Sequence, residues 1–153
     1  MQIRRMETGD VEEAAKIEAA IFSMPWSKEA FLDAIKADYT LFLVAEQEGK
    51  VAGYIGLYLA ADEAEITNVA VAKEYRRGHV GEALVTKAIS LAQQRGAVSI
   101  FLEVRCSNAA AIALYEKMGF SNCGVRKGFY ERPKEDAHVM VLTPDITTVQ
   151  TID

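Results

Sequence analysis

The sequence predicts a mixed α/β (α+β) fold, with one central, mostly antiparallel sheet of about six or seven strands and about four helices on its two faces. The first observation is that helical spacing of apolar residues gives way to strand-like runs near residue 40. The second is that strand and helix patterns alternate after residue 65, as in a parallel crossover. The chain of 153 residues has the length of one domain, which we assign to residues 1–142, followed by a flexible tail over residues 143–153.

The first forty residues are expected to contain an edge strand and two helices. Residues 2–6 alternate weakly and are assigned to the edge strand. Thr8 or Asp10 can cap a first amphipathic helix. Pro25 interrupts this helical pattern, and Ser27 can cap a second helix with one apolar side.

An antiparallel hairpin and a third strand are expected next. The apolar runs Leu41–Ala45 and Val51–Leu59 are joined by a Gln-Glu-Gly-Lys turn, which indicates a hairpin. Gly53 and Gly56 within the second run indicate a bulge or a close backbone approach. A third strand over residues 65–71 leads into a basic loop and a helix.

The second half of the chain continues the sheet. The helix after the basic loop ends near Gly96, which can adopt a left-handed C-cap. Residues 99–104 form a strand parallel to the one before the helix, because a crossover separates the two. Asn108 can cap the next helix. A last pair of strands is assigned to residues 120–126 and 137–142, with a polar loop carrying an exposed aromatic pair between them.

Composition and charge exclude several classes of function. The net charge of −5 argues against a general nucleic-acid binder, although it is compatible with basic peptides or amines as substrates. The N-terminus lacks the apolar core of a signal peptide, and no apolar run approaches the about eighteen residues of a membrane span. Cys106 and Cys123 are too few for a disulfide framework, and with the two histidines they lack metal-site spacing. We expect a cytoplasmic protein without a metal.

The most informative stretch is the strand, basic loop and helix over residues 66–94. The loop Arg76-Arg-Gly-His-Val-Gly81 precedes a helix whose first backbone N–H groups are free, which favours an anion such as phosphate. It is neither a Walker loop nor a dinucleotide fingerprint, since it lacks their glycine and lysine spacing. Taken alone, the loop could equally be a surface turn before an amphipathic helix.

Three segments together carry a family resemblance: Asn68-Val-Ala-Val71, Tyr75 to Leu84, and Leu102-Glu-Val-Arg-Cys-Ser-Asn-Ala-Ala-Ala-Ile-Ala-Leu-Tyr-Glu-Lys-Met-Gly-Phe120. They resemble the GNAT superfamily of acetyl-CoA-dependent N-acetyltransferases. Within it the chain is most similar to the RimI type, which acetylates the amino-terminal alanine of a small-subunit ribosomal protein. Residues 22–27 and 128–137 agree with this resemblance, which covers residues 1–142.

The resemblance implies an acetyl-CoA site. The N–H groups of Arg77 to Glu82 would bind the pyrophosphate, and Arg76 or Arg77 would add charge. The backbone of Val69 and Val71 would pair with the pantetheine amides, which requires the strands at 65–71 and 99–104 to splay apart. A backbone N–H there could polarise the thioester carbonyl. The implied cofactor-binding residues are Val69, Ala70, Val71, Arg76, Arg77, Gly78, His79, Val80, Gly81, Glu82 and Asn108.

One position departs from the family pattern. The family loop usually has a glycine where this chain has His79, with Gly78 just before it. Phosphate ligands in such a loop are backbone N–H groups, so an outward side chain is tolerable there. If the position requires positive φ, histidine is an uncommon residue for it.

The resemblance also implies catalytic roles. Glu103 lies in an otherwise apolar strand and would be the general base; alternatively, it is an end-of-strand carboxylate that reaches solvent or pairs with Arg105. Tyr115 would protonate the departing thiolate as general acid, and it shares a helix face with Asn108. For a lone Tyr on such a helix, core packing is the alternative.

Two further predictions concern the acceptor and the route. Trp26 and Tyr130 lie in segments suited to the walls of a peptide groove, although each is also typical of a packing residue. Cys106 could carry an acetyl-thioester, but no neighbouring residue supplies a base for it.

The sequence therefore predicts a monomeric N-terminal acetyltransferase that transfers the acetyl group of acetyl-CoA directly to a peptide or protein N-terminus, in a ternary complex. The proposed acceptor is the N-terminal alanine of a ribosomal protein. The alternatives are acetylation of a small amine or a lysine side chain, and a CoA-binding module without turnover.

Overall fold

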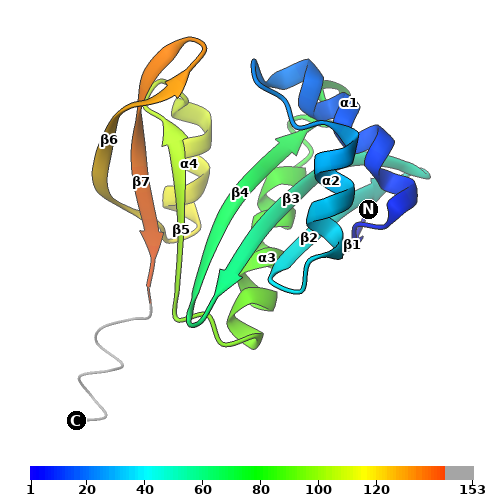
Figure 1. Ribbon diagram of the computed structural model, residues 1–153, viewed down its shortest axis with the longest axis horizontal. Helices are drawn as coiled ribbons and strands as arrows, with labels where there is room; N and C mark the ends of the chain where they lie inside the picture. The colour runs from blue at the N-terminus through cyan, green and yellow to red at the C-terminus, as the bar shows by residue number, and fades with distance from the viewer. Residues whose placement is uncertain (144–153) are drawn as a thin grey trace.

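The computed structural model describes residues 1–143, so the predicted tail falls, except for Thr143, outside the described residues. Seven strands form one sheet in the order β1-β2-β3-β4-β5-β7-β6 (Figure 1). The strands are β1 (Gln2–Arg5), β2 (Thr40–Gln47), β3 (Lys50–Ala60), β4 (Glu63–Val71), β5 (Ser99–Arg105), β6 (Ser121–Glu131) and β7 (Lys134–Leu142). The helices are α1 (Val11–Ile21), α2 (Lys28–Lys36), α3 (Val80–Gln94) and α4 (Ala109–Lys117), with short 3-10 turns at Thr8–Asp10 and Lys73–Tyr75.

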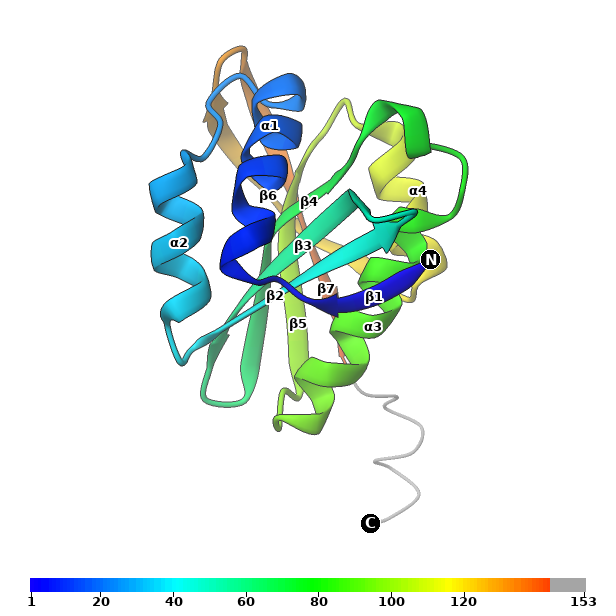
Figure 2. The same ribbon diagram turned by 90° about the vertical axis from the view of Figure 1, so that its right-hand side faces the viewer.

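The predicted fold class is confirmed. Strands β4 and β5 are parallel, and the other neighbouring strands of the sheet are antiparallel. Helices α1 and α2 cover one face and α3 and α4 the other (Figure 2). Each face has its own apolar core: Phe31, Phe42 and Tyr54 lie in the core under α1 and α2, while Leu84 and Leu102 lie in the core under α3 and α4.

The start of α2 confirms its predicted cap at Ser27, whereas the start of α1 contradicts the cap predicted at Asp10. The hydroxyl of Ser27 accepts from the N–H of Ala30 (3.1 Å), and α2 begins there. Asp10 occupies the N-cap position of α1, but its side chain makes no capping hydrogen bond to the helix. Its two carboxylate oxygens instead accept from the guanidinium of Arg4 at 2.8 and 2.9 Å, because the turn at residues 8–10 brings the carboxylate against β1.

A β-bulge in β4 determines the shape of the functional region. Gly56 pairs with Asn68 while Leu57 pairs with Ile66, so Thr67 is an extra residue in β4. The extra residue reverses the alternation of side chains, since Ile66 and Val69 both contact the α3 side of the sheet. A bulge also bends its strand and increases its twist. The prediction of a bulge near Gly56 is therefore confirmed.

The predicted splay between β4 and β5 is also confirmed. Their described pairing runs only from Glu63 with Ser99 to Ile66 with Leu102. Beyond that point β4 continues to Val71 on the side of β3, whereas β5 continues to Arg105 on the side of β7. Figure 1 shows the two strands diverging from their point of contact.

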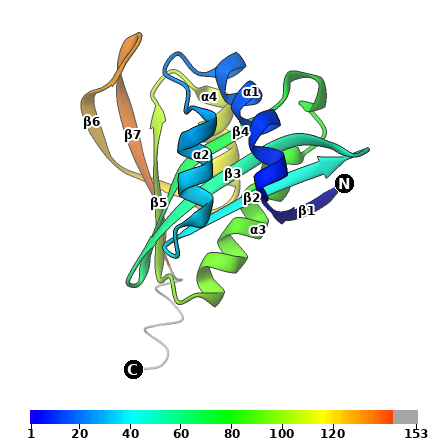
Figure 3. The same ribbon diagram turned by 45° about the vertical axis from the view of Figure 1, so that its right-hand side comes forward.

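The last hairpin is longer than predicted. The segment at residues 127–136, expected to be a polar loop, belongs mostly to β6 and β7, whose turn is at Arg132 and Pro133. The register of β6 with β7 is irregular between Arg126 and Tyr130. The polar residues of this segment therefore lack the alternation that would have indicated a strand. In Figure 3 this hairpin stands at the end of the sheet opposite β1.

Within residues 1–143, no helix is long and apolar enough to cross a membrane.

Candidate active site

A cleft of about 1130 Å³ lies where β4 and β5 separate. Its walls come from the ends of these strands, the start of α3, one face of α4, the α1–α2 connection and the β6–β7 turn. The hydroxyl of Ser23 donates a hydrogen bond to the carbonyl of Arg132, which links the last two walls. All of the residues predicted for the site line this cleft except Gly78.

The start of α3 presents a row of backbone donors to the cleft. Within the described chain, the first N–H of this helix with an intrachain acceptor is that of Ala83, which donates to the carbonyl of His79 (3.0 Å). The N–H groups from Arg77 to Glu82 precede it, at the positive end of the helix dipole. An anion with several oxygens can accept from such a row, so the segment fits a pyrophosphate.

The loop before α3 has left-handed backbone at Arg77 (φ 70°) and His79 (φ 59°), on either side of Gly78. A Cβ at Gly78 would lie 3.3 Å from the carbonyl oxygen of Tyr75, a tight contact that glycine avoids. The position where the family has a glycine therefore does require positive φ in this chain. His79 meets that requirement as a histidine.

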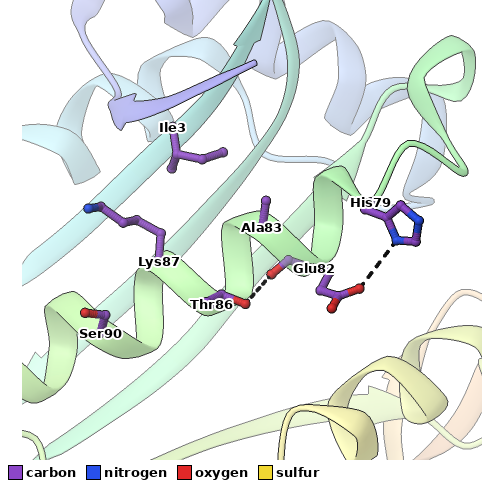
Figure 4. Close-up of a pocket in the computed structure, with 7 residues that line it drawn as sticks. All are labelled: Ile3, His79, Glu82, Ala83, Thr86, Lys87 and Ser90. Atoms are coloured by element: carbon purple, nitrogen blue, oxygen red, sulfur yellow. Dashed lines mark hydrogen bonds and ion pairs between the residues drawn. The ribbon is translucent and has the colours of Figure 1, made fainter.

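The His79 side chain points away from the helix axis and is 81% exposed (Figure 4). Its Nδ1 lies 3.5 Å from Oε2 of Glu82, an oxygen that also accepts from Nζ of Lys117 at 3.1 Å. These two partners lower the pKa of the Glu82 carboxyl, with Lys117 as the larger cause. His79 and Glu82 also border a second cavity of about 580 Å³ on the outer side of α3.

The free edge of β4 forms the middle of the cleft. Val69 and Val71 pair with Ile55 and Gly53 of β3, so their other edge faces the space that β5 has left. An extended chain with amide groups can add to such an edge as a strand would. Nε of Arg76 donates to the carbonyl of Val71 (3.3 Å), which holds this arginine at the boundary between β4 and the loop before α3.

Glu103 lies at the deep end of the splay, and its side chain is only 10% exposed. Arg126 of β6 is its ion-pair partner, with Nε 3.6 Å from Oε1. The alternative pairing with Arg105 is wrong, because Arg105 binds Glu135 (3.2 Å) and the carbonyls of the β6–β7 turn instead. A largely enclosed carboxylate beside an open strand edge is placed to accept a proton from a ligand in the cleft.

Tyr115 projects from α4 into the cleft and is 7% exposed. Its ring packs edge-on against Phe120, with the centroids 5.7 Å apart. Burial raises the pKa of the hydroxyl to about 12, with a smaller contribution from Tyr130. The hydroxyl therefore keeps its proton at neutral pH and can donate it. Asn108 starts the same helix, where its Oδ1 accepts from the N–H of Ala111 (3.2 Å).

The two residues predicted for the acceptor side occupy opposite walls. The Tyr130 ring lies beneath the Arg105 guanidinium, with Cζ 4.3 Å from the ring centroid. Burial raises the pKa of the Tyr130 hydroxyl to about 12. Trp26 packs against Phe31 and Phe42, at centroid distances of 5.3 and 5.9 Å, so much of its ring belongs to the core.

Sequence reasoning missed Glu18, which lines the cleft, and Glu65 and Arg126, which lie beside Glu103. Glu18 is buried and accepts from the backbone N–H of Trp26 (3.0 Å) and from the hydroxyl of Tyr54. Its position on the apolar stripe of α1 was the available signal. Glu65 and Arg126 carry no such signal, because only strand register brings them to Glu103.

Within residues 1–143 no cluster of ligating side chains could hold a metal.

Residues 11–120 match the acetyltransferase (GNAT) family. The chain therefore belongs to that family, as an acetyl-CoA-dependent N-acetyltransferase.

Its relatives include the ribosomal protein bS18-alanine N-acetyltransferase of Escherichia coli (strain K12), which is 38% identical over 142 residues, 92% of this chain and 95% of that protein. A Bacillus subtilis (strain 168) protein provisionally named for the same activity is 39% identical over 142 residues, which are 92% of this chain and 94% of that protein. The crystal structure of the Escherichia coli ribosomal-protein-S18-alanine N-acetyltransferase superposes with a TM-score of 0.85 at 37% identity, covering 93% of this chain and 92% of that one.

Proposed function

We propose that this protein transfers the acetyl group of acetyl-CoA to the α-amino group of the N-terminal alanine of ribosomal protein bS18. The observation that carries the proposal is the similarity, over 92% of the chain, to an enzyme named for that reaction. The cleft supports it, since it has an anion-binding end, an open strand edge and a buried carboxylate in one continuous space. A ribosomal acceptor would place the reaction in the cytoplasm, and we expect the enzyme to act as a monomer.

Cofactor binding would use mainly the backbone. The N–H groups from Arg77 to Glu82 would donate hydrogen bonds to the pyrophosphate oxygens, with the Arg76 and Arg77 side chains adding charge. The free edge at Val69, Ala70 and Val71 would hydrogen-bond the pantetheine amides and could polarise the thioester carbonyl. The side-chain oxygen of Asn108 caps α4, and its NH2 group would add one polar contact to the cofactor. When bound, acetyl-CoA supplies the activated acetyl group.

The chemistry would be direct transfer between two positioned groups. An N-terminal ammonium has a pKa of about 7.7–8.0, so a base needs to remove only one easily lost proton before the nitrogen attacks. Glu103 would take that proton, directly or through water. Tyr115, which burial keeps protonated, would donate its proton to the departing thiolate. The second proton that the nitrogen loses as the amide forms would then replace it on the hydroxyl. Trp26 and Tyr130 would line the acceptor groove between the two loops.

The proposal is tested with purified protein, acetyl-CoA and an acceptor panel. The panel holds a bS18 N-terminal peptide, its variants beginning with Ser, Met or Gly, an amino-blocked lysine peptide and free polyamines. We expect acetyl transfer to the bS18 peptide with the highest kcat/KM. Under the proposal, in which the acceptor site is fitted to alanine, enlarging the first residue to Met should lower kcat/KM by at least about tenfold. Mass spectrometry identifies the acetylated nitrogen.

Transfer only to lysine or polyamine would contradict the proposed acceptor but retain the enzyme class. Binding of CoA without transfer to any acceptor would favour a regulatory module. Equal transfer to all N-termini would mean that the enzyme is a general N-terminal acetyltransferase.

A second experiment tests the base. Glu103→Gln should lower kcat/KM by about 10²–10³-fold near pH 6.5, because a general base contributes about 10²–10⁴-fold, and by less near pH 9, where the acceptor amine is already free. The Kd for acetyl-CoA should not change. Glu116→Gln, which alters an exposed carboxylate on α4, is the control and should keep the wild-type profile. A pH–rate profile of Glu103→Gln parallel to that of the wild type would refute the role.

A further inference from the structure

Glu65 is a charged residue beside the cleft that the proposed reaction does not use. It is a register partner of Phe101 in the parallel pairing of β4 with β5, one pair before the pairing ends at Ile66 and Leu102. Glu103 follows Phe101 by two residues, so it lies on the same face of the sheet. Glu65 and Glu103 are therefore diagonal neighbours on adjacent strands, and Glu103 contributes to the raised pKa of Glu65.

Other titratable and charged groups complete this cluster. Tyr58 of β3 is the register partner of Glu65 on its other side. Arg126 of β6 approaches Glu103 from across β7, with 3.6 Å between Nε and Oε1, and Tyr130 of β6 lies near the same carboxylate. Burial, together with the adjacent Glu103, raises the pKa of Glu65 to about 6, while Arg126 opposes the increase. The cluster thus holds two carboxylates for one nearby guanidinium.

We propose that Glu65 is a positioning residue for Glu103: from the diagonal position on the neighbouring strand, its carboxyl group acts on the Glu103 carboxylate through charge and hydrogen bonding. The inference rests on the proposed role of Glu103 as general base. When Glu65 is ionised, the like charge makes Glu103 a stronger base. When Glu65 is protonated, it donates to Glu103 and makes it a weaker base. Arg126 acts in the opposite direction to the ionised Glu65, since a cation favours the ionised form of Glu103.

The test compares pH profiles of kcat/KM for three variants with the same bS18 peptide. Glu65→Gln replaces the ionised carboxylate by a neutral donor, so the acidic limb should move down by about one pH unit and the rate at pH 7.5 should fall about threefold to tenfold, because the base is weaker. Arg126→Met should move the acidic limb upward. Glu63→Gln changes an exposed carboxylate two residues earlier on the same strand and should leave the profile unchanged.

A direct measurement separates this inference from the proposed function. The carboxyl ¹³C titration of Glu103 needs no acceptor, and in Glu65→Gln it should shift to lower pH than in the wild type. An unchanged Glu103 titration, with thermal unfolding showing an intact fold, would overturn the role of Glu65. A fully active Glu103→Gln variant would instead overturn the proposed base, and with it any use of Glu65 in the reaction.

Discussion

His79 shows how one side chain can depart from a family pattern while the backbone keeps its geometry. Its φ of 59° lies in the left-handed region, where a Cβ is crowded against the following carbonyl. Histidine tolerates this conformation better than most residues but worse than glycine. The imidazole is 81% exposed, so the donor row at the start of α3 remains open to a ligand.

A substitution series at this position tests whether the backbone or the imidazole matters. His79→Gly should be at least as stable as the wild type, because relief of about 1 kcal/mol of left-handed strain offsets the greater entropy of an unfolded glycine. His79→Val should be the least stable, since a β-branched residue is a clear outlier at positive φ. Thermal unfolding gives the order.

Binding of acetyl-CoA supplies the second readout of that series. The glycine variant should keep its Kd within about threefold, because the proposed phosphate ligands are N–H groups. A loss of more than about tenfold would show that the imidazole itself binds the cofactor.

At the scale of elements, β4 positions the site through a single extra residue. The Thr67 bulge moves the strand away from β5, and the hydroxyl of Thr67 donates to Oδ1 of Asn68 (2.7 Å) and to the carbonyl of Gly56 (3.3 Å). These contacts stabilise the extra residue in a defined conformation. The same strand therefore pairs with β5 at one end and offers a free edge to a ligand at the other.

The α1–α2 connection is positioned by a buried carboxylate. Glu18 holds the backbone of Trp26 and the hydroxyl of Tyr54, whose pKa is raised by burial and by this partner. Removing Glu18 would leave the buried Tyr54 hydroxyl and the partly buried N–H of Trp26 without this acceptor, so the connection that forms one wall of the cleft depends on a residue of the core. Ser23 then links this wall to the β6–β7 turn.

What the sequence could predict follows from the range of each interaction. Local signals predicted the Ser27 cap, the Asn108 cap and the left-handed Gly96, because each depends on a few adjacent residues. The splay was predicted through family resemblance alone. The pairing of Glu103 with Arg126 and the contact with Glu65 could not be predicted, since strand register over large sequence separations decides them.

For the whole molecule, the carboxyl groups of Asp10 and Glu65 make the free energy of unfolding depend on pH in opposite directions. Hydrogen bonds from Arg4 lower the pKa of Asp10, so its contribution is present above its unfolded pKa of about 3.9 and is lost as pH falls through the lower folded value. Burial and Glu103 raise the pKa of Glu65 from an unfolded value of about 4.3 to about 6. The folded state then binds the extra proton, so that contribution is present below about pH 4.3 and is lost as pH rises through about 6.

Thermal unfolding between pH 3 and 8 should therefore separate the two groups. Glu65→Gln should raise the Tm at pH 7.5 by about 2–4 °C, which corresponds to about 1 kcal/mol after allowance for solvent screening of a partly exposed group, and should give no gain at pH 4.5. Asp10→Asn should lower the Tm at pH 7.5, and the difference from the wild type should shrink toward pH 3, where the wild-type carboxylate begins to protonate. If Glu65→Gln changed the Tm equally at both pH values, the effect would come from packing. Repulsion between the ionised Glu65 and Glu103 would then not destabilise the folded protein. A gain confined to the higher pH would show that the fold tolerates a repulsive carboxylate pair next to its cleft, as expected if that pair is kept for the reaction.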